Sequence, residues 1–385
     1  MDLKLFFDPI DESLSSKQFS IDSLIQSVYV NKDKMPELDQ MQIAIIGLTE
    51  TRGCSYLEDT GVKQIREKLF GLKKGPQSCN IVDLGNLRNG PELEETYKRV
   101  QSVGHYLMSN DVLPLFIGGS QDLNIGQFFS YEEEDKMVSI LNVDSRFDLG
   151  NPKQSEPHAH HLHRIFTHLP NYLFNYSQLG HQSYLVNSDA TKVLEQLSFS
   201  PIRLGEVREN INLMEPHIRE ADMLTFDISS IQSIYCPAGN QTEVFGLTGE
   251  EACQIMWYAG MNDKLSSVGI YEYNLVKDTD NGQSAMVVAT MIWYFIEGFK
   301  NRKSEKGFQT NDYMKYIVTT DSSETERIVF YKSRLSDKWW MEVPNRAHTG
   351  IFDRNYIVPC DFEDYELASA GEVPERWINT YSKMV

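Results

Sequence analysis

Two apolar segments between residues 112 and 150, each followed by a polar cluster, constrain the fold of this chain more than any other feature. Val112–Ile117 and Val138–Val143 have the length and β-branched content of buried strands. Gly118–Asp122 follows the first segment, and Asp144–Asp148 follows the second. Ligands of open α/β sheets bind beyond the carboxyl ends of the strands. We therefore expect a candidate site at these two strand ends; a salt-bridged strand end is the plainer alternative.

Strand and helix signals alternate through residues 42–300. This alternation predicts an α/β fold with a mainly parallel sheet and right-handed crossovers. The further predicted strands are Gln42–Gly47, Asn80–Gly85, Tyr184–Val186, Met223–Ile228 and Val268–Tyr273, and the predicted helices are Gly61–Leu72, Pro91–Met108, Gly249–Met261 and Gln283–Lys300.

The chain divides by its pattern into three parts. Residues 1–40 form an irregular or partly helical lead-in, 41–300 form the main domain, and 301–385 form a Trp-rich C-terminal appendix. Within the appendix we predict an antiparallel set of strands at Tyr313–Thr319, Arg327–Ser333 and Lys338–Val343, a closing helix at Pro374–Met384, and the tryptophans Trp339, Trp340 and Trp377. We expect these tryptophans to pack the appendix on the main domain; the alternative is an exposed surface for an unknown protein partner.

Charge and cysteine content exclude several classes of partner. The chain has 385 residues and a formal net charge of −19, which disfavours binding to nucleic acid and to anionic membrane surfaces. Its five cysteines are scattered without CxxC spacing, as expected of reduced thiols rather than a disulfide framework or a zinc site. No apolar segment approaches the roughly 20 residues of a membrane span. We expect a cytoplasmic protein.

Several motifs, taken together, resemble the arginase, agmatinase and formimidoylglutamase family of ureohydrolases. The resemblance covers residues 42–300 and implies a three-layer α/β/α fold, with an oligomer also implied. It is closest to the formimidoylglutamase branch at Tyr176–Tyr184 (YSQLGHQSY). The other motifs are Pro114–Asp122 against GGDHS, Asn142–Asp148 against DAHxD, Thr225–Ser229 (TFDIS) against SFDxD, Gly246–Thr248 (GLT), and Ile270–Asn274 (IYEYN) against an E-x-N strand.

The resemblance implies two manganese ions held by six side chains, and three of those positions differ here. The family uses a histidine from GGDHS, Asp-His-Asp from DAHxD and two aspartates from SFDxD. Three aspartates match, at Asp144, Asp148 and Asp227. The differing positions are Gln121 for the first histidine, Arg146 for the second histidine and Ser229 for one aspartate.

Arg146 is expected to prevent binding of the second ion. A guanidinium group has no lone pair to offer and stays protonated in proteins, so Arg146 is excluded as a ligand. Its charge is expected where the second ion would lie. Ser229 removes a carboxylate from the same shell. We therefore expect the second metal site to be lost.

Two interpretations of the first site remain open. If Gln121 presents its carbonyl oxygen, then Gln121, Asp144, Asp148 and Asp227 form an all-oxygen shell for one hard divalent cation such as Mg²⁺, Ca²⁺ or Mn²⁺. Alternatively, Arg146 makes bidentate hydrogen bonds to the aspartates and no metal binds. We favour the metal-free, salt-bridged cluster and expect no cofactor.

The expected function follows from the loss of the metal pair. The main hypothesis is a pseudoenzyme that serves as a binding or structural module. The alternative is a formimidoylglutamase-like hydrolase of C–N bonds in linear amidines with a reduced metal site. A third is a ligand sensor in which Glu272, which matches a family position for the substrate's cationic end, and Arg146 bind the two ends of a zwitterion. The histidines of His158–His163 are expected on a solvated loop, with Zn²⁺ or Ni²⁺ binding as the alternative.

Overall fold

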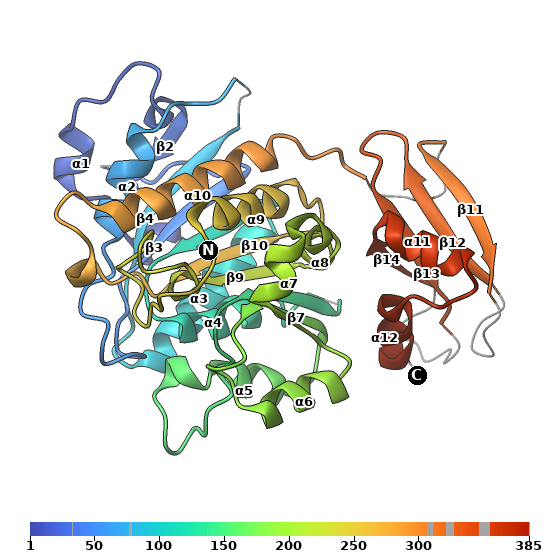
Figure 1. Ribbon diagram of the computed structural model, residues 1–385. Coiled ribbons are helices and arrows are strands. Elements are labelled where there is room, and N and C mark those ends of the chain that lie inside the picture. The colour runs from blue at the N-terminus through green and yellow to red at the C-terminus, as the bar shows by residue number, and fades with distance from the viewer. Residues whose placement is uncertain are drawn as a thin grey trace.

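The computed structural model describes residues 1–32, 34–76, 79–134, 136–305, 308, 311–320, 327–345 and 355–384. In these ranges the chain forms a large α/β part and a smaller β-rich part beside it (Figure 1). None of the helices in these ranges is both long and apolar enough to cross a bilayer.

The main sheet has ten strands among the described residues and is almost entirely parallel. Its order is β1-β4-β3-β5-β10-β9-β6-β7-β8, with β2 also pairing β4, and only the β1–β4 pairing is antiparallel. The strands are β1 (Phe7–Asp8), β2 (Val28–Val30), β3 (Ile43–Leu48), β4 (Ile81–Leu87), β5 (Leu113–Ile117), β6 (Val138–Val143), β7 (Leu173–His181), β8 (Ser200–Arg203), β9 (Met223–Asp227) and β10 (Ser267–Tyr271).

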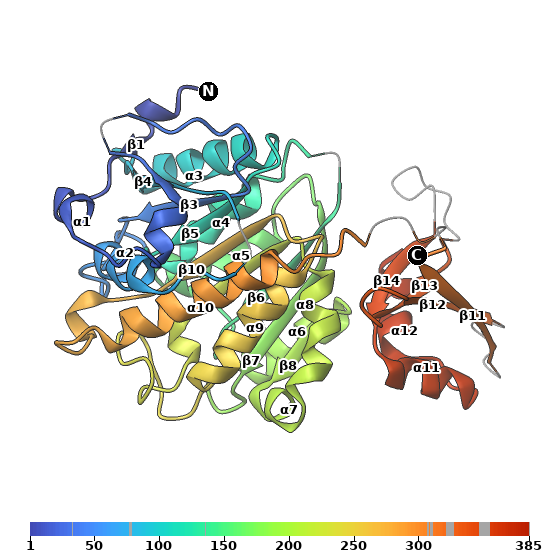
Figure 2. The same cartoon turned by 90° about the horizontal axis from the view of Figure 1, so that it is seen from above.

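Helices cover both faces of this sheet because its strands are apolar on both sides. In β3, Ile43 and Ile45 pack into one core, and Ala44 and Ile46 pack into the other. The first face carries α1 (Glu12–Ser16), α2 (Val62–Gly71), α7 (Leu204–Glu209), α8 (Glu215–Glu220), α9 (Gly249–Met261) and α10 (Gln283–Phe299). The second carries α3 (Leu93–Met108), α4 (Asn124–Phe129), α5 (His161–Phe166) and α6 (Ser188–Gln196). The predicted three-layer α/β/α fold is therefore confirmed (Figure 2).

A buried ion pair fixes α2 against the sheet. Arg66 of α2 is 1% exposed, and its Nε and Nη2 donate to the two carboxylate oxygens of Asp83 in β4 at 2.8 and 2.9 Å. Nη2 also donates to the carbonyl oxygen of Gly85 at 2.8 Å. The bidentate geometry and the additional acceptor compensate the desolvation of both charges.

The C-terminal part is an antiparallel sheet with two helices on one face. Its strands, in order, are β11 (Tyr313–Thr319), β12 (Arg327–Ser333), β13 (Trp339–Val343) and β14 (Tyr356–Cys360), followed by α11 (Phe362–Ser369) and α12 (Glu375–Met384). Trp339 and Trp377 lie in its core, and Trp340 is 5% exposed. All three tryptophans are thus buried. The tryptophans are not exposed as that alternative expected, and a partner surface elsewhere on the appendix stays a prediction.

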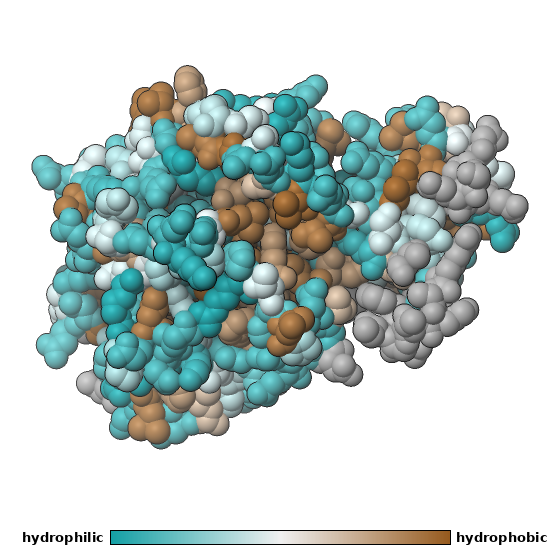
Figure 3. All heavy atoms as spheres, turned by 90° about the horizontal axis from the view of Figure 1, so that it is seen from below, coloured by the Kyte–Doolittle hydropathy of each residue, from teal (hydrophilic) through white to brown (hydrophobic). Residues whose placement is uncertain are grey.

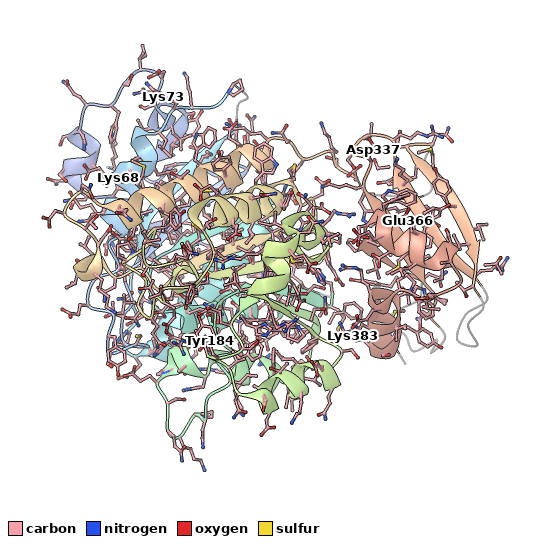
Figure 4. The ribbon with its side chains drawn as sticks, viewed as in Figure 1. Lys68, Lys73, Tyr184, Asp337, Glu366 and Lys383 are labelled. Carbon is pink, nitrogen blue, oxygen red and sulfur yellow. The ribbon has the colours of Figure 1, made fainter. Side chains whose placement is uncertain are left out.

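Polar contacts link the two parts. Arg219 of α8 donates to the carbonyl oxygens of Trp339 and Cys360 at 3.0 and 3.1 Å, and its guanidinium lies 4.3 Å from the Trp340 ring centroid. Figure 4 shows Lys383 of α12 extending toward the main part, where its ammonium contacts Asn175 Oδ1 of β7. Phe174 of β7 also contacts Tyr356 of β14, with ring centroids 4.6 Å apart, so both polar and apolar contacts link the appendix to the main part.

Three sequence predictions differ from the structure. Residues 184–186 lie in a turn, and the strand in this region is β7, whose buried polar residues obscure the apolar pattern. The lead-in contributes β1 and β2 to the main sheet, although both are too short to give a strand signal. In the appendix, β14 and α11 were not predicted.

Figure 3 shows one face of the molecule, where hydrophobic residues gather near the centre within a mostly hydrophilic surface.

Candidate functional site

A narrow cavity lies at the carboxyl ends of β5, β6, β9 and β10, and it brings all the candidate residues together. In open α/β sheets, ligands bind beyond the carboxyl ends of the strands, so this edge is the expected place for a ligand. The residues that line it are Gln121, Asp144, Ser145, Arg146, Asp148, His158, Asp227, Ser229, Gln241 and Glu272.

The loop after β5 reaches the cavity through a turn that glycine permits. Gly118 and Gly119 have φ angles of +89° and +77°, and a Cβ at Gly118 would lie 2.8 Å from the carbonyl oxygen of Leu48. This turn places Gln121 so that its main-chain N–H donates to Glu272 Oε1 at 2.7 Å. The loop and the end of β10 are thereby joined at the cavity wall.

The loop after β6 is held by a neighbouring strand. Gln178 of β7 is buried, and its Nε2 donates to the carbonyl oxygens of both Asp144 and Arg146 at 2.9 Å. Asp144 Oδ1 accepts from the Arg146 N–H at 2.9 Å. This arrangement turns the Asp144 and Asp148 side chains into the same cavity, as the strand-end pattern predicts.

Burial and mutual repulsion raise the pKa values of four carboxyl groups here. Burial is the first cause for Asp144, Asp227 and Glu272, and the nearby charge of another carboxylate is the second. The pKa of Asp148 is raised to about 7, again mainly by burial. Among the described residues, Asp144 Oδ2 and Glu272 Oε2 have no hydrogen-bond donor. Protons or a cation are needed to compensate such a cluster.

The contact with His161 indicates the protonation state of Asp148 when no cation is bound. Burial lowers the pKa of His161 to about 3, so its imidazole is neutral. With its Nδ1 donating to Asn124 Oδ1 at 2.9 Å, its Nε2 is an acceptor facing Asp148 Oδ2 at 3.2 Å. A proton on Asp148 completes this contact. The raised pKa of Asp148 agrees with that requirement.

The raised pKa of Asp148 predicts that the metal-free protein loses stability as pH rises. Between pH 3.8, the ordinary pKa, and about pH 7, Asp148 is protonated in the folded chain and ionised in the unfolded chain. Raising the pH through this range therefore lowers the free energy of unfolding. We expect Asp148→Asn, which cannot ionise, to lack this share of the decrease. Melting temperatures of chelator-treated wild type and variant, measured from pH 4 to pH 8, test it. Parallel curves would contradict the prediction; Asp189→Asn on the exposed face of α6 serves as control.

Arg146 does not form the expected bonds with the aspartates. Its Nη2 lies 2.6 Å from Glu243 Oε1, and both side chains are about one-third exposed. The favoured salt-bridged cluster is therefore wrong, because a carboxylate 97 positions away in the sequence binds the guanidinium instead. The buried aspartates remain without a cationic partner among the described residues.

The other two differing positions are occupied by neutral, hydrogen-bonded groups. Gln121 Nε2 donates to Asn142 Oδ1 at 2.9 Å, which leaves Oε1 as the acceptor of this amide. Ser229 donates its N–H to Asp227 Oδ1 at 2.6 Å, and its hydroxyl accepts from the Gln241 N–H at 3.1 Å. Neither residue adds a negative charge.

The histidine segment is less exposed than predicted. His158 is 8% exposed and lines the cavity, and His161 is fully buried beside Asp148. The expectation of a solvated loop is wrong for these two residues, because the segment folds back over the sheet edge and begins α5. Cys54 also lies close to the cavity residues His158 and Glu272. Cys54 was not singled out from the sequence, because it is one of five scattered cysteines and lies in none of the motifs named above.

Comparison with known proteins places the sequence in a family. The sequence model of the arginase family matches residues 42–297. A formimidoylglutamase of Staphylococcus aureus (strain JH9) is 25% identical over 282 residues, which cover 70% of this chain and 88% of the relative.

Solved structures share the fold at lower sequence identity. The formiminoglutamase of Trypanosoma cruzi with Mn²⁺₂ superposes with a TM-score of 0.65 at 18% identity, covering 73% of this chain and 99% of that one. The formimidoylglutamase of Bacillus subtilis subsp. subtilis str. 168 superposes with a TM-score of 0.64 at 15% identity, covering 75% of this chain and 95% of that one. The appendix lies beyond the residues matched by the family model.

Proposed function

Because the chain belongs to the arginase family, we propose that it hydrolyses a C–N bond of a linear amidine with the help of one divalent cation. The observation that carries this proposal is the cluster of Asp144 and Asp227, which are buried, with Asp148, which is mostly buried; none of the three has a cationic partner among the described residues. The relatives named formimidoylglutamase support the substrate class.

The residues present fit one cation better than two. Asp144, Asp148 and Asp227 offer carboxylate oxygens, and the unpaired Asp144 Oδ2 is the clearest ligand atom. Gln121 can add its amide oxygen to the same shell. Such an all-oxygen set suits Mn²⁺, Mg²⁺ or Ca²⁺. A second ion of the family type lacks donors, because Arg146 and Ser229 stand at two of its ligand positions.

Two charged residues are suited to hold the ends of a substrate. Glu272 is 2% exposed, with its Oε2 unpaired among the described residues, so it can accept hydrogen bonds from a cationic amidine. Arg146 is partly exposed at the cavity wall, and its partner Glu243 is equally accessible. A substrate carboxylate can compete with Glu243 for this guanidinium. These positions favour a substrate with charges at both ends.

The remaining chemistry depends on water at the cavity. A divalent cation supplies positive charge that favours ionisation of water near neutral pH. Asp148 and His161 form a hydrogen-bonded pair at the cavity and can hold a proton between them. The narrow cavity limits the number of competing water molecules around the reacting carbon.

Asp227→Asn tests this proposal. We expect the wild-type chain with Mn²⁺ to release formamide or ammonia from formimidoylglutamate or a related amidine, and the variant to lose at least about a hundredfold in kcat/KM, since even outer partners of metal ligands cost about 10–100-fold. Asp189→Asn is the matched control. Turnover that is equal in Asp227→Asn and wild type would reject the role of the cluster.

A second candidate function is a non-catalytic binding module, and one observation favours it. Three of the six family ligand positions carry Gln121, Arg146 and Ser229, none of which is a family ligand type. In this case the partner surface is proposed on the appendix, at the edge strand β11, where Ile317 is 59% exposed. Absence of amidine turnover by the Mn²⁺-loaded wild type, with partner capture that depends on residues 301–385, would favour it.

A further inference from the structure

Three potential metal ligands of different chemical types converge beside the aspartate cluster. The Cys54 sulfur, one ring nitrogen of His158 and a carboxylate oxygen of Glu272 all lie within 4.8 Å of one another. The residues are 0%, 8% and 2% exposed, respectively. Neither Cys54 nor His158 matches any of the six family ligand positions named above. Their convergence therefore requires its own explanation.

Separate parts of the chain hold these three side chains in place. Cys54 lies in the loop after β3, and the preceding Gly53 accepts at its carbonyl oxygen from the His158 N–H at 3.2 Å. Glu272 follows β10 with a φ of +67°, a left-handed conformation that costs energy for a residue with a side chain. Its N–H donates to the carbonyl oxygen of Gly119 at 3.0 Å. The surrounding loops thus impose this orientation on Glu272.

The hydrogen bonds of the three side chains leave capacity for a ligand. Glu272 Oε1 accepts from the Gln121 N–H, but Oε2 has no partner among the described residues although it is buried. Burial and the charge of Glu272 raise the pKa of the Cys54 thiol to about 12, so the free thiol is protonated, and Asn240 Nδ2 donates to Cys54 Sγ at 2.8 Å. Glu156 Oε2 lies 3.4 Å from His158 Nε2, and a carboxylate beside an imidazole orients the ring and increases its basicity.

We propose that Cys54, His158 and Glu272 bind a zinc-type cation at a second position, distinct from the aspartate site. Sulfur, nitrogen and oxygen donors together suit Zn²⁺, whereas the all-oxygen aspartates suit harder cations. Three protein ligands leave a fourth coordination position, and His158 and Glu272 both line the cavity toward which it would open. Ligation releases the thiol proton of Cys54. Glu272 Oε2 is also the atom proposed above to accept from a cationic amidine, so the metal ion and the amidine compete for it, and zinc binding is measured without substrate.

Cobalt substitution of the full-length, metal-free chain tests the proposal. Co²⁺ bound to a thiolate gives a charge-transfer absorption band that oxygen ligands do not produce. We expect this band in the wild type, and we expect Cys54→Ser and His158→Asn to weaken Co²⁺ and Zn²⁺ binding by at least about a hundredfold, more than loss of an outer partner. Isothermal titration with Zn²⁺ supplies the affinities.

Two controls separate this site from its surroundings. Cys79→Ser removes another buried thiol, which lines a different cavity, and is expected to keep the band. Asp227→Asn is expected to keep the band while losing Mn²⁺. A wild type without the band, a band that survives in Cys54→Ser, or a band lost in Asp227→Asn would each overturn the proposal. If Cys54→Ser does not fold, as judged by circular dichroism, His158→Asn decides.

Discussion

Replacing Arg146 by histidine and Ser229 by aspartate is expected to raise Mn²⁺ binding from one ion to two ions per chain. Each substitution makes the cavity more negative by one unit. Histidine supplies a ring nitrogen where the guanidinium has no lone pair, and aspartate supplies a charged carboxylate in place of a neutral hydroxyl. One positive charge at roughly 4 Å from a divalent ion costs several kcal/mol even at an effective dielectric constant near 20. Removal of that charge is therefore the larger of the two effects.

Equilibrium dialysis with elemental analysis measures the number of ions, and the electron paramagnetic resonance spectrum reports coupling between neighbouring Mn²⁺ ions. The matched control is Arg146→Lys with Ser229→Asp, which keeps the positive charge and is expected to bind one ion. Two tightly bound Mn²⁺ ions in the wild type would show that Arg146 does not prevent binding of the second. The prediction that the second metal site is lost would then be wrong.

Arg66→Met is expected to destabilise the fold by about 3–5 kcal/mol, because it leaves the Asp83 carboxylate buried without its partner. Both side chains are almost completely buried, so solvent does not compensate the remaining charge. Urea unfolding followed by circular dichroism gives the change in the free energy of unfolding. We expect the midpoint to fall without a large change in slope.

Two further variants show whether the charge is the cause. Arg203→Met removes an exposed ion pair with Glu206 and is expected to leave the free energy of unfolding almost unchanged. Arg66→Met combined with Asp83→Leu removes both charges and is expected to recover much of the lost stability. If the double variant is as unstable as Arg66→Met, packing volume rather than an unpaired charge explains the effect.

Regular elements with a continuous apolar pattern were predictable from the sequence. The strand Val138–Val143 and the helix Gly249–Met261 have the predicted bounds, because hydrophobic periodicity and the Thr248 capping box define them locally. β7 was misplaced because Asn175, Ser177 and Gln178 interrupt its apolar pattern. Those polar side chains are buried because tertiary hydrogen bonds satisfy them, and such bonds leave no local signal.

The membership of the candidate cavity was also accessible from motifs, but its ion pairing was not. Asp144, Asp148 and Asp227 follow strands whose carboxyl ends meet, so their proximity follows from the sheet. The choice of Glu243 rather than an aspartate as the partner of Arg146 depends on how a distant loop folds. Likewise, Cys54 and His158 lie in loops that are far apart in the sequence and are joined by a main-chain hydrogen bond, which leaves no local sequence signal.

The amide of Gln178 has a consequence for how this protein can change. It donates hydrogen bonds to the main-chain carbonyl oxygens on both sides of Ser145, but Gln178 itself is not among the residues that line the cavity. Substitutions in β7 can therefore change the affinity for the proposed cation while Asp144, Asp148 and Asp227 are all retained. Keeping the three aspartates does not by itself keep the distances between them.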